Sequence, residues 1–264
     1  MDISSIVFSA LSLGGLGLLF GLGLGYAAKK FAVEVDPLIP IVREALPGAN
    51  CGACGFAGCD AFAKAIVEGK APTNGCPVGG KETAANVSRI MGVEAVVSAR
   101  KVAYVKCQGN CDVAINKYEY LGVMDCKSAA FLQGKGAKGC EFGCLGLGSC
   151  VRACEFNAID IINGVAVIND NCVACGKCVL ECPKALIEMV PNDSKVRVSC
   201  ASLDKGKTVK ENCSVGCIAC KMCEKACEFD AIHVNNNIAK IDYEKCTQCD
   251  ACVEKCPTKA ILHL

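Results

Sequence analysis

Two cysteine runs between residues 217 and 257 decide the fold: Cys217-Ile-Ala-Cys220-Lys-Met-Cys223-Glu-Lys-Ala-Cys227 and Cys246-Thr-Gln-Cys249-Asp-Ala-Cys252-Val-Glu-Lys-Cys256-Pro257. In each run two residues separate the first three cysteines, and three residues precede the fourth. Thiolates at this spacing suit a polynuclear metal centre, whereas structural zinc usually takes two separate Cys-x2-Cys pairs. The pattern therefore predicts a small fold built around bound metal.

Paired runs of this kind are typical of bacterial ferredoxins with two [4Fe–4S] clusters. In those proteins the first three cysteines of each run bind one cluster and the fourth binds the other. Cys256 is then expected to complete the first cluster and Cys227 the second. Residues 231–234 and 238–241 are expected to form the two strands of a hairpin that covers the clusters.

The segment upstream repeats this unit. Cys154-Glu-Phe-Asn-Ala-Ile159 matches Cys227-Glu-Phe-Asp-Ala-Ile232, and Asn163-Gly164 is the expected turn of an equivalent hairpin. The first run departs from the pattern, because Leu147 stands where Cys220 stands in the second unit. Cys140 is the natural substitute. The repeat thus predicts two more ligand sets: Cys140, Cys144, Cys150 and Cys182 for one, and Cys154, Cys172, Cys175 and Cys178 for the other.

A further site is expected near the N-terminus, where Cys51-Gly-Ala-Cys54-Gly-Phe-Ala-Gly-Cys59 is followed by Cys76-Pro77. The interleaved glycines allow the loop to wrap closely and to aim backbone N–H groups at a cluster. Four cysteines would also suit tetrahedral zinc, which is the alternative here. We expect a [4Fe–4S] cluster held by Cys51, Cys54, Cys59 and Cys76.

These sets use 20 of the 25 cysteines and leave five: Cys107, Cys111, Cys126, Cys200 and Cys213. Five is one more than a cluster needs. The preferred interpretation is a sixth cluster held by Cys107, Cys126, Cys200 and Cys213, with Cys111 as an alternative ligand. In another interpretation, all five are buried thiols that act as small apolar side chains.

Composition narrows the class of protein. An odd number of cysteines, in runs at two-residue spacing and without a cleavable secretory signal, argues against a disulfide scaffold. The 28 basic and 27 acidic residues give a net charge of +1, which offers no electrostatic basis for binding nucleic acid. Two lysine groups could dock an acidic carrier or simply form a solvated surface: Lys127, Lys135 and Lys138, and Lys205, Lys207 and Lys210.

The N-terminal segment is expected to span a membrane. No charged residue occurs from Ile3 to Ala28, and a helix of that length exceeds the roughly 30 Å apolar core of a bilayer. Lys29-Lys30 follow the segment and Asp2 precedes it, so the positive-inside rule puts the rest of the chain in the cytoplasm. Gly17, Gly21 and Gly25 share one helical face that would let a neighbouring helix approach closely, or they simply reflect the higher glycine content of membrane helices.

The expected fold class is α+β, with a single transmembrane helix, a small helical [4Fe–4S] domain and two tandem two-cluster ferredoxin-like modules. The expected boundaries are 1–30 for the anchor, 31–95 for the N-terminal cluster domain, 96–139 for a connecting segment with extra ligands, 140–190 for the first module, 191–212 for a second connecting segment and 213–264 for the second module. Gly134-Lys-Gly136-Ala-Lys-Gly139 has the letters of a dinucleotide-binding loop, but it runs straight into Cys140 and opens no helix. His233 and His263 are expected to be structural or exposed.

In its order of parts, the chain resembles the B subunit of the Rnf complex, the ion-translocating ferredoxin:NAD oxidoreductase. The resemblance rests on the uncharged helix running into Tyr26-Ala-Ala-Lys-Lys-Phe-Ala-Val-Glu34, on Leu46-Pro-Gly-Ala-Asn-Cys-Gly-Ala-Cys-Gly-Phe-Ala-Gly-Cys59 and on the repeats. It implies a membrane-anchored electron-transfer subunit that accepts electrons from soluble ferredoxin and passes them to flavin- and NAD-handling subunits. Partner membrane subunits would move Na⁺ or H⁺.

The expected localisation is the inner (cytoplasmic) membrane, with a single pass and the bulk of the chain on the cytoplasmic side. The expected cofactors are [4Fe–4S] clusters, six in number, and we expect no substrate-converting site in this chain. Two alternatives remain: the electron-input subunit of another membrane oxidoreductase, and a carrier or scaffold that hands its clusters on.

Overall fold

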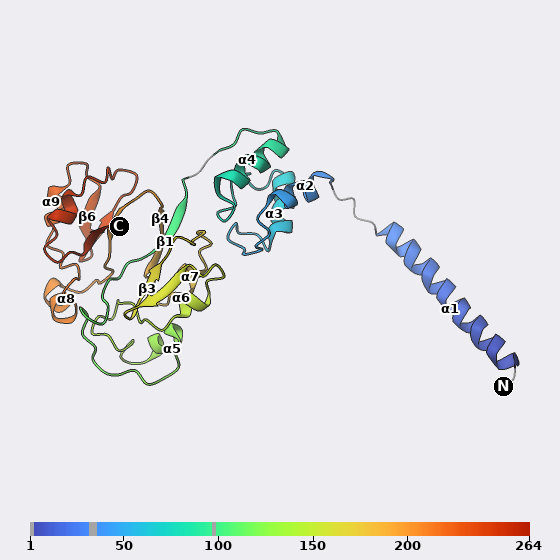
Figure 1. Cartoon of the computed structure of the whole chain (residues 1–264), viewed down its shortest axis with the longest axis horizontal. Coiled ribbons are helices and arrows are strands. Elements are labelled where there is room, and N and C mark those ends of the chain that lie inside the picture. Colours follow the sequence, from blue (N-terminus) through green and yellow to red (C-terminus); the bar gives the residue numbers. More distant parts are fainter. Residues whose placement is uncertain (1–2, 32–35, 97–98) are drawn as a thin grey trace.

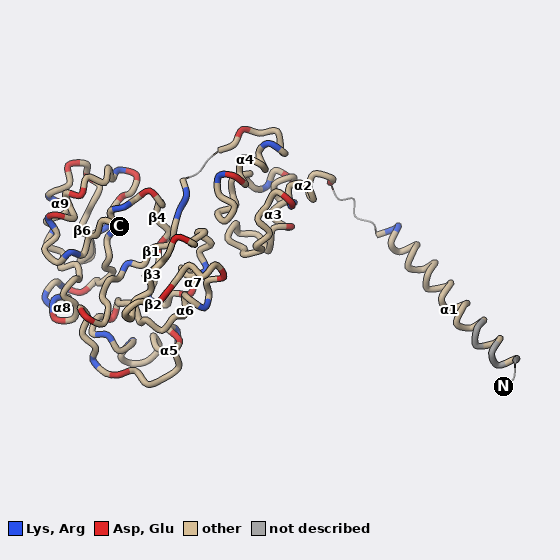
Figure 2. The backbone as a smooth tube through the Cα atoms, in the orientation of Figure 1, with Lys and Arg blue, Asp and Glu red and all other residues tan. Residues whose placement is uncertain are grey.

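The computed structural model describes residues 3–31, 36–96 and 99–264. Its first element is α1 (Ile3–Lys30), a helix long and apolar enough to cross a membrane. Almost all side chains described along α1 are exposed, and the charges of Lys29 and Lys30 come at its end (Figure 2). An apolar helix that the other described residues leave uncovered is what a membrane span requires.

Three helices follow: α2 (Leu38–Ala45), α3 (Cys59–Val67) and α4 (Gly80–Met91). They form a small helical group beside the larger body of the protein (Figure 1). Val42, Phe62, Ile66 and Val87 are fully or almost fully buried in its core. The group holds the Cys51–Cys76 segment, whose first three cysteines lie in or next to the loop that leads into α3.

The larger body contains two units of the same build (Figure 1). In the first unit β1 (Lys101–Val105) pairs antiparallel with β4 (Ile187–Pro191), and β2 (Ile159–Ile162) pairs with β3 (Val165–Ile168). The turn between β2 and β3 is Asn163-Gly164, and both residues have positive φ angles, as a tight hairpin turn requires. The unit also contains α5 (Cys126–Phe131), α6 (Ser149–Arg152) and α7 (Lys177–Glu181).

The second unit repeats the arrangement. Its outer strands β5 (Val196–Val198) and β8 (Ile261–His263) pair antiparallel, and β6 (Ile232–Asn235) pairs with β7 (Ile238–Ile241) around Asn236 and Asn237. The helices are α8 (Gly206–Asn212), α9 (Met222–Ala226) and α10 (Ala251–Glu254). Both hairpins predicted from the sequence are confirmed, and the protein has a mixed helix and sheet architecture.

The outer strands begin before the cysteine runs. β1 lies within residues 96–139 and β5 within residues 191–212, the two segments that the sequence suggested only as connections. Each pairs with the last strand of its own unit, β4 or β8. Each unit is therefore larger than its cysteine pattern, because a strand far upstream closes it.

Candidate iron–sulfur sites

Four of the cysteine groups that the spacing predicts are kept as candidate sites. We name them by their residues: site 1 comprises Cys51, Cys54, Cys59 and Cys76; site 2, Cys154, Cys172, Cys175 and Cys178; site 5, Cys217, Cys220, Cys223 and Cys256; site 6, Cys227, Cys246, Cys249 and Cys252. The members of site 5 line one cavity and those of site 6 another. The fourth cysteines thus cross between the halves of the second unit, with Cys256 in site 5 and Cys227 in site 6.

The cysteine loops have an unusual backbone. Ala219 and Lys221 flank Cys220, and Gln248 and Asp250 flank Cys249, all with positive φ angles. Non-glycine residues rarely adopt this left-handed region, and they remain in it only where the surroundings impose it. The equivalent positions of the interrupted run are glycines, Gly146 and Gly148, also at positive φ. The loop therefore keeps its shape around Leu147 although Leu147 replaces the expected cysteine.

Backbone N–H groups point at several sulfur atoms. Ala158 N donates to Cys154 Sγ at 3.4 Å, Leu186 N to Cys182 Sγ at 3.5 Å and Ala231 N to Cys227 Sγ at 3.3 Å. Each donor lies four residues after its acceptor, so the same local turn serves both units. N–H groups aimed at sulfur stabilise the thiolate form, which is the form that binds iron.

Site 3 differs from the sequence prediction. The cavity between α6 and β4 is lined by Cys126, Cys144, Cys150 and Cys182, and Cys140 does not line it. We define these four residues as site 3. The lining of this cavity therefore favours Cys126 over Cys140 for the place left by Leu147, which differs from the expected grouping.

A polar network explains the position of Cys126. Asp125 caps α5 by accepting a hydrogen bond from Ser128 N at 2.8 Å, and it also accepts one from Ser149 Oγ at 2.7 Å. Ser149 Oγ in turn accepts a bond from Cys126 N at 2.7 Å, and Arg152 pairs with Asp125 at 3.2 Å. Because Ser149 and Arg152 belong to α6, which carries Cys150, the network fixes Cys126 beside Cys150. The hydrogen bonds lower the pKa of Asp125 to about 2, with a smaller contribution from the Arg152 charge.

Cys140 lies in another cavity, which Cys126 does not line. Cys107, Cys140, Cys200 and Cys213 line one narrow cavity between the two units, and we define them as site 4. Each unit supplies two of them by the same rule. Cys107 and Cys200 each follow the outer strand of their unit by two residues, while Cys140 and Cys213 each stand four residues before the first cysteine of a run. This approximate twofold relation was visible in the sequence only for Cys140 and Cys213.

Cys111 lies outside all six sites. Its thiol is exposed and faces the β2–β3 turn, where a Cβ added to Gly164 would come within 2.7 Å of Cys111 Sγ. Every cysteine except Cys111 is thus assigned to a candidate group of four. Within the described ranges, no three His, Cys, Asp or Glu side chains gather closely enough to hold a single metal ion, and the thiols line cavities instead.

Burial and the repulsion between neighbouring thiolates favour the binding of a positively charged group at these sites. Burial raises the pKa of the Cys150 thiol to about 12, and the neighbouring sulfurs of Cys144, Cys126 and Cys182 add to the shift. Burial likewise raises the pKa of Cys223 to about 12 and that of Cys252 to about 11, again with contributions from the thiols of their own sites. Four thiolates at such a place are unstable unless a cation neutralises them. The donor set and its burial thus fit iron–sulfur clusters, which would supply one-electron carriers when bound.

Mutual effects on thiol pKa values and one hydrogen bond link neighbouring candidate sites in numerical order. Cys51 of site 1 contributes to the raised pKa of Cys175 in site 2, after burial as the main cause, and Cys178 of site 2 contributes in the same way to the pKa of Cys150 in site 3. Cys144 N of site 3 donates to Cys107 Sγ of site 4 at 3.4 Å. Burial raises the pKa of Cys200 in site 4 to about 11, and Cys217 of site 5 lies close enough to affect it. Sites 5 and 6 then share α9 and α10.

The lysines behave as two different groups. Lys127 and Lys135 form ion pairs with Glu181 and Glu141, and Lys138 is buried. The expectation of a solvated or docking surface is therefore wrong for Lys138. Its Nζ donates to Gly109 O at 2.6 Å and to Gly164 O at 2.9 Å, next to site 4. Lys205, Lys207 and Lys210 are exposed on or beside α8 and remain candidates for docking.

Comparisons with known proteins give a consistent picture. A family model for an Fe-S cluster matches residues 46–78, and a 4Fe-4S binding domain matches residues 239–262. The chain is 51% identical over 251 residues to the B subunit of the Na(+)-translocating ferredoxin:NAD(+) oxidoreductase complex of Acetobacterium woodii, which covers 94% of this chain and 75% of that protein. It is 47% identical over 262 residues to the B subunit of the ion-translocating oxidoreductase complex of Methanosarcina acetivorans, covering 98% and 99%. The B subunit of a proton-translocating ferredoxin:NAD(+) oxidoreductase complex from Clostridium ljungdahlii is 43% identical over 251 residues, covering 93% and 88%.

Proposed function

The chain belongs to the family of B subunits of the ion-translocating ferredoxin:NAD oxidoreductase (Rnf) complexes, and from this membership we propose that it carries electrons along six [4Fe–4S] sites. As a member it is an electron-transfer subunit of such a complex. The finer proposal concerns the route: electrons enter the second unit from reduced ferredoxin, pass from site 6 or site 5 through sites 4, 3 and 2, and leave at site 1.

The observation that carries this proposal is the unbroken order of the cysteine groups. Site 4 draws Cys107 and Cys140 from the first unit and Cys200 and Cys213 from the second, so both units share this one relay position. Cys220 of site 5 and Cys249 of site 6 are exposed, which supports entry at that end. Both units are proposed to be ferredoxin-like modules, because each has the crossed fourth cysteine and the covering hairpin of that fold.

The opposite end of the row is nearest the membrane along the chain. Site 1 begins about twenty residues after α1, which favours exit there towards the flavin- and NAD-handling membrane subunits. We propose a single pass with the sites on the cytoplasmic side, since Lys29-Lys30 follow the span. A reporter fused after Leu264 should then be active in the cytoplasm, and periplasmic activity would refute this orientation.

Ion movement is assigned to partner subunits. The span carries no ionisable group before Tyr26, and relatives of comparable identity are named for Na⁺ in one case and for protons in another. A pure electron-transfer role for this chain is compatible with both. Interlocked ligands such as Cys227 and Cys256 favour permanent clusters over the alternative of a cluster carrier.

Cys200→Ser tests the route. The substitution should disable site 4 and leave sites 5 and 6 intact, so fast electron uptake from reduced ferredoxin should fall from about six to about two electrons per chain. The measurement is stopped-flow absorbance with the anaerobically purified protein, together with its iron content. Cys111→Ser is the matched control and should change neither the number of electrons taken up nor the iron content. If the Cys200→Ser protein lost only about four iron atoms and ferredoxin still reduced every remaining cluster rapidly, the order of the row would be wrong.

A further inference from the structure

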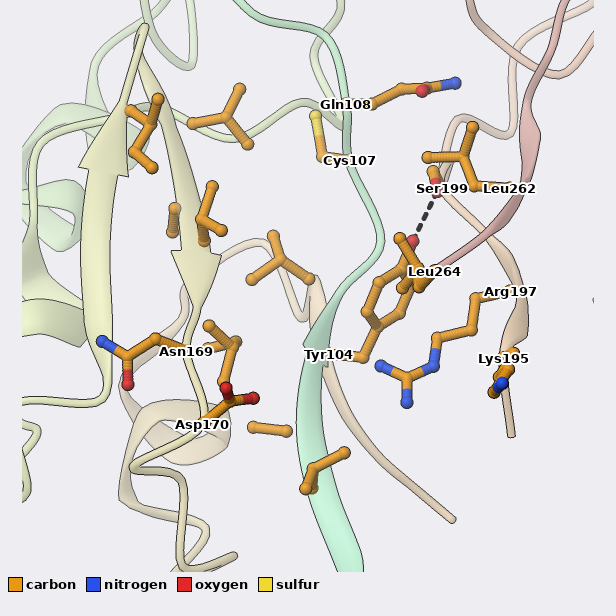
Figure 3. A pocket seen from close by; sticks show the side chains of 18 of the residues that line it. Tyr104, Cys107, Gln108, Asn169, Asp170, Lys195, Arg197, Ser199, Leu262 and Leu264 are labelled. Atoms are coloured by element: carbon orange, nitrogen blue, oxygen red, sulfur yellow. Dashed lines mark hydrogen bonds between the residues drawn. The ribbon is translucent and has the colours of Figure 1, made fainter. Parts of the chain in front are cut away.

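A deep cleft separates the two units and has no role in the proposed electron route. It has a volume of about 750 Å³, and β1 runs through the middle of its lining, with β3 on one side and β5 and β8 on the other (Figure 3). Cavities of this size are typical of sites for small organic molecules. Its lining combines an apolar side, which includes Val165, Val167 and Ile168 of β3, with a polar side around Arg197.

Arg197 is the central feature of the polar side. The residue is only 9% exposed, its Nε donates to Ser194 O at 3.0 Å, and its guanidinium lies 5.0 Å from the centre of the Tyr104 ring. In the ranges 3–31, 36–96 and 99–264, no carboxylate pairs with it and no hydrogen bond uses its two Nη atoms. A buried guanidinium without an anion is unfavourable, and the free edge formed by its two Nη groups matches the geometry of a carboxylate or phosphate.

Ser194 provides an independent indication. The residue is 4% exposed and lines the same cleft, yet its Oγ has no hydrogen-bond partner within the described chain. Buried hydroxyl groups are almost always hydrogen-bonded, so an orphaned one needs an explanation. A ligand that accepts a bond from Ser194 Oγ would supply it, and the Ser194 carbonyl already positions Arg197.

The charge of the lining agrees with an anionic ligand. Arg100, Lys195 and Arg197 face one carboxylate side chain, that of Asp170, which lies across the cleft from Lys195 (Figure 3). Arg100 is already engaged, since its Nη2 donates to Cys172 O at 3.1 Å. The Tyr104 hydroxyl is also engaged, because it forms a hydrogen bond with Ser199 Oγ. This bond holds the ring in place against the Arg197 guanidinium. Lys195 and Arg197 remain to attract an anion.

We propose that this cleft binds a small amphipathic organic anion, whose carboxylate or phosphate group engages Arg197 and Ser194 and whose apolar body lies against β3. The ligand would reach Cys107, which lines both this cleft and the cavity of site 4. Binding of the anion does not require the proposed electron route. Any effect on electron transfer through the nearby site 4 does rest on it.

The test uses the full-length, cluster-loaded protein in detergent and four simple probes. Phenyl phosphate and benzoate carry both an anion and an apolar ring, phenol lacks the charge, and inorganic phosphate lacks the ring. Isothermal titration calorimetry should give saturable binding of at least one of the first two in the millimolar range or tighter, and binding of phenol and inorganic phosphate at least about tenfold weaker.

Variants locate the binding. Arg197→Gln should weaken binding of the probe by at least about tenfold, and Ser194→Ala should weaken it by a smaller factor. Arg89→Gln, at an exposed arginine of α4, should have no effect on binding. Iron content and the visible spectrum show whether each variant keeps its clusters. The Ser194→Ala change removes only one oxygen atom, so it remains informative if Arg197→Gln fails to fold. Absence of saturable binding for both ring-bearing anions, equal binding of inorganic phosphate, or unchanged binding in both cleft variants would overturn the proposal, and none of these results bears on the order of the six sites.

Discussion

The two units of the body solve the same ligation problem in different ways. The second unit completes site 5 from one local run, Cys217, Cys220 and Cys223, with Cys256 crossing over. The first unit has Leu147 in the position of Cys220 and brings in Cys126 from α5 to complete site 3. The loop backbone is nevertheless the same in both, with positive φ angles at Gly146 and Gly148 and at Ala219 and Lys221. The difference shows that the shape of the loop and the source of its ligand can vary separately.

The largest effect is expected when the ligand of site 3 is moved from α5 to the loop position that it has in site 5. Cys126→Ser should remove about four iron atoms, because site 3 loses a ligand that no neighbour can replace. Adding Leu147→Cys to that variant should restore them, since residue 147 holds the position of Cys220 in an equivalent loop. Iron and sulfide analysis of the purified proteins measures both outcomes.

The matched control is Cys140→Ser with and without the same Leu147→Cys change. It should also lose about four iron atoms, from site 4, but Leu147→Cys should not restore them. Rescue of the Cys140 variant in place of the Cys126 variant would show that the grouping from sequence was right and that the structural one is wrong.

A smaller effect is expected at Asp125, which positions Cys126 without touching a cluster. Asp125→Asn should make iron leave site 3 several-fold faster at neutral pH, because the charge-assisted bonds to Ser149 and Arg152 weaken. The folded-state pKa of Asp125, about 2, lies below its ordinary value of 3.8. The stabilisation is therefore present at every pH above about 4 and is lost only as the pH falls towards 2.

Iron release followed with a chelator from pH 7 to pH 5 should consequently show a constant ratio between the Asp125→Asn protein and the unmodified protein. Asp193→Asn, at an exposed aspartate outside this network, is the control and should behave like the unmodified protein. A ratio that shrank to one within this range would mean that Asp125 titrates near neutrality, contrary to its hydrogen bonds.

The smallest expected effect is a shift in potential at site 4, the position where the two units meet. Lys138 is buried next to this site and has two carbonyl partners but no carboxylate among the residues described. Lys138→Met should lower the midpoint potential of one cluster by on the order of 50–100 mV, the effect of a unit charge about 7–14 Å away at an effective dielectric constant of about 20. EPR-monitored redox titration measures it. Lys135→Met, at an exposed lysine paired with Glu141, should leave all potentials unchanged within error, and an equal shift in that control would remove the special role of Lys138.

Features whose residues are close in the chain could be predicted from the sequence. The two hairpins, the apolar helix and the shared cavities around Cys220 and Cys249 follow from local spacing and composition. The choice between Cys126 and Cys140 could not be predicted, since it depends on where α5 docks. The signal for that docking was present but weak: Asp125 and Ser128 form a helix N-cap directly at Cys126. Nothing local predicted the Ser149 and Arg152 contacts that complete it.

The cleft around Arg197 could not be predicted from the sequence either. Arg197 and Tyr104 lie on β5 and β1, almost a hundred residues apart, and only the pairing of each strand with the end of its own unit brings them into one cavity. A lone arginine in a β-strand carries no sequence signature of a binding site. The burial of Lys138 was missed for a related reason, because Gly109 and Gly164 approach it from distant segments.

An unbroken row of six four-cysteine sites requires a defined metal content, which iron and sulfide analysis measures. The anaerobically purified full-length protein should contain about 24 iron and about 24 sulfide per chain, from six clusters of four. A result near 20 of each would mean that one of the six groups holds no cluster, and the proposed row would then be broken at that site.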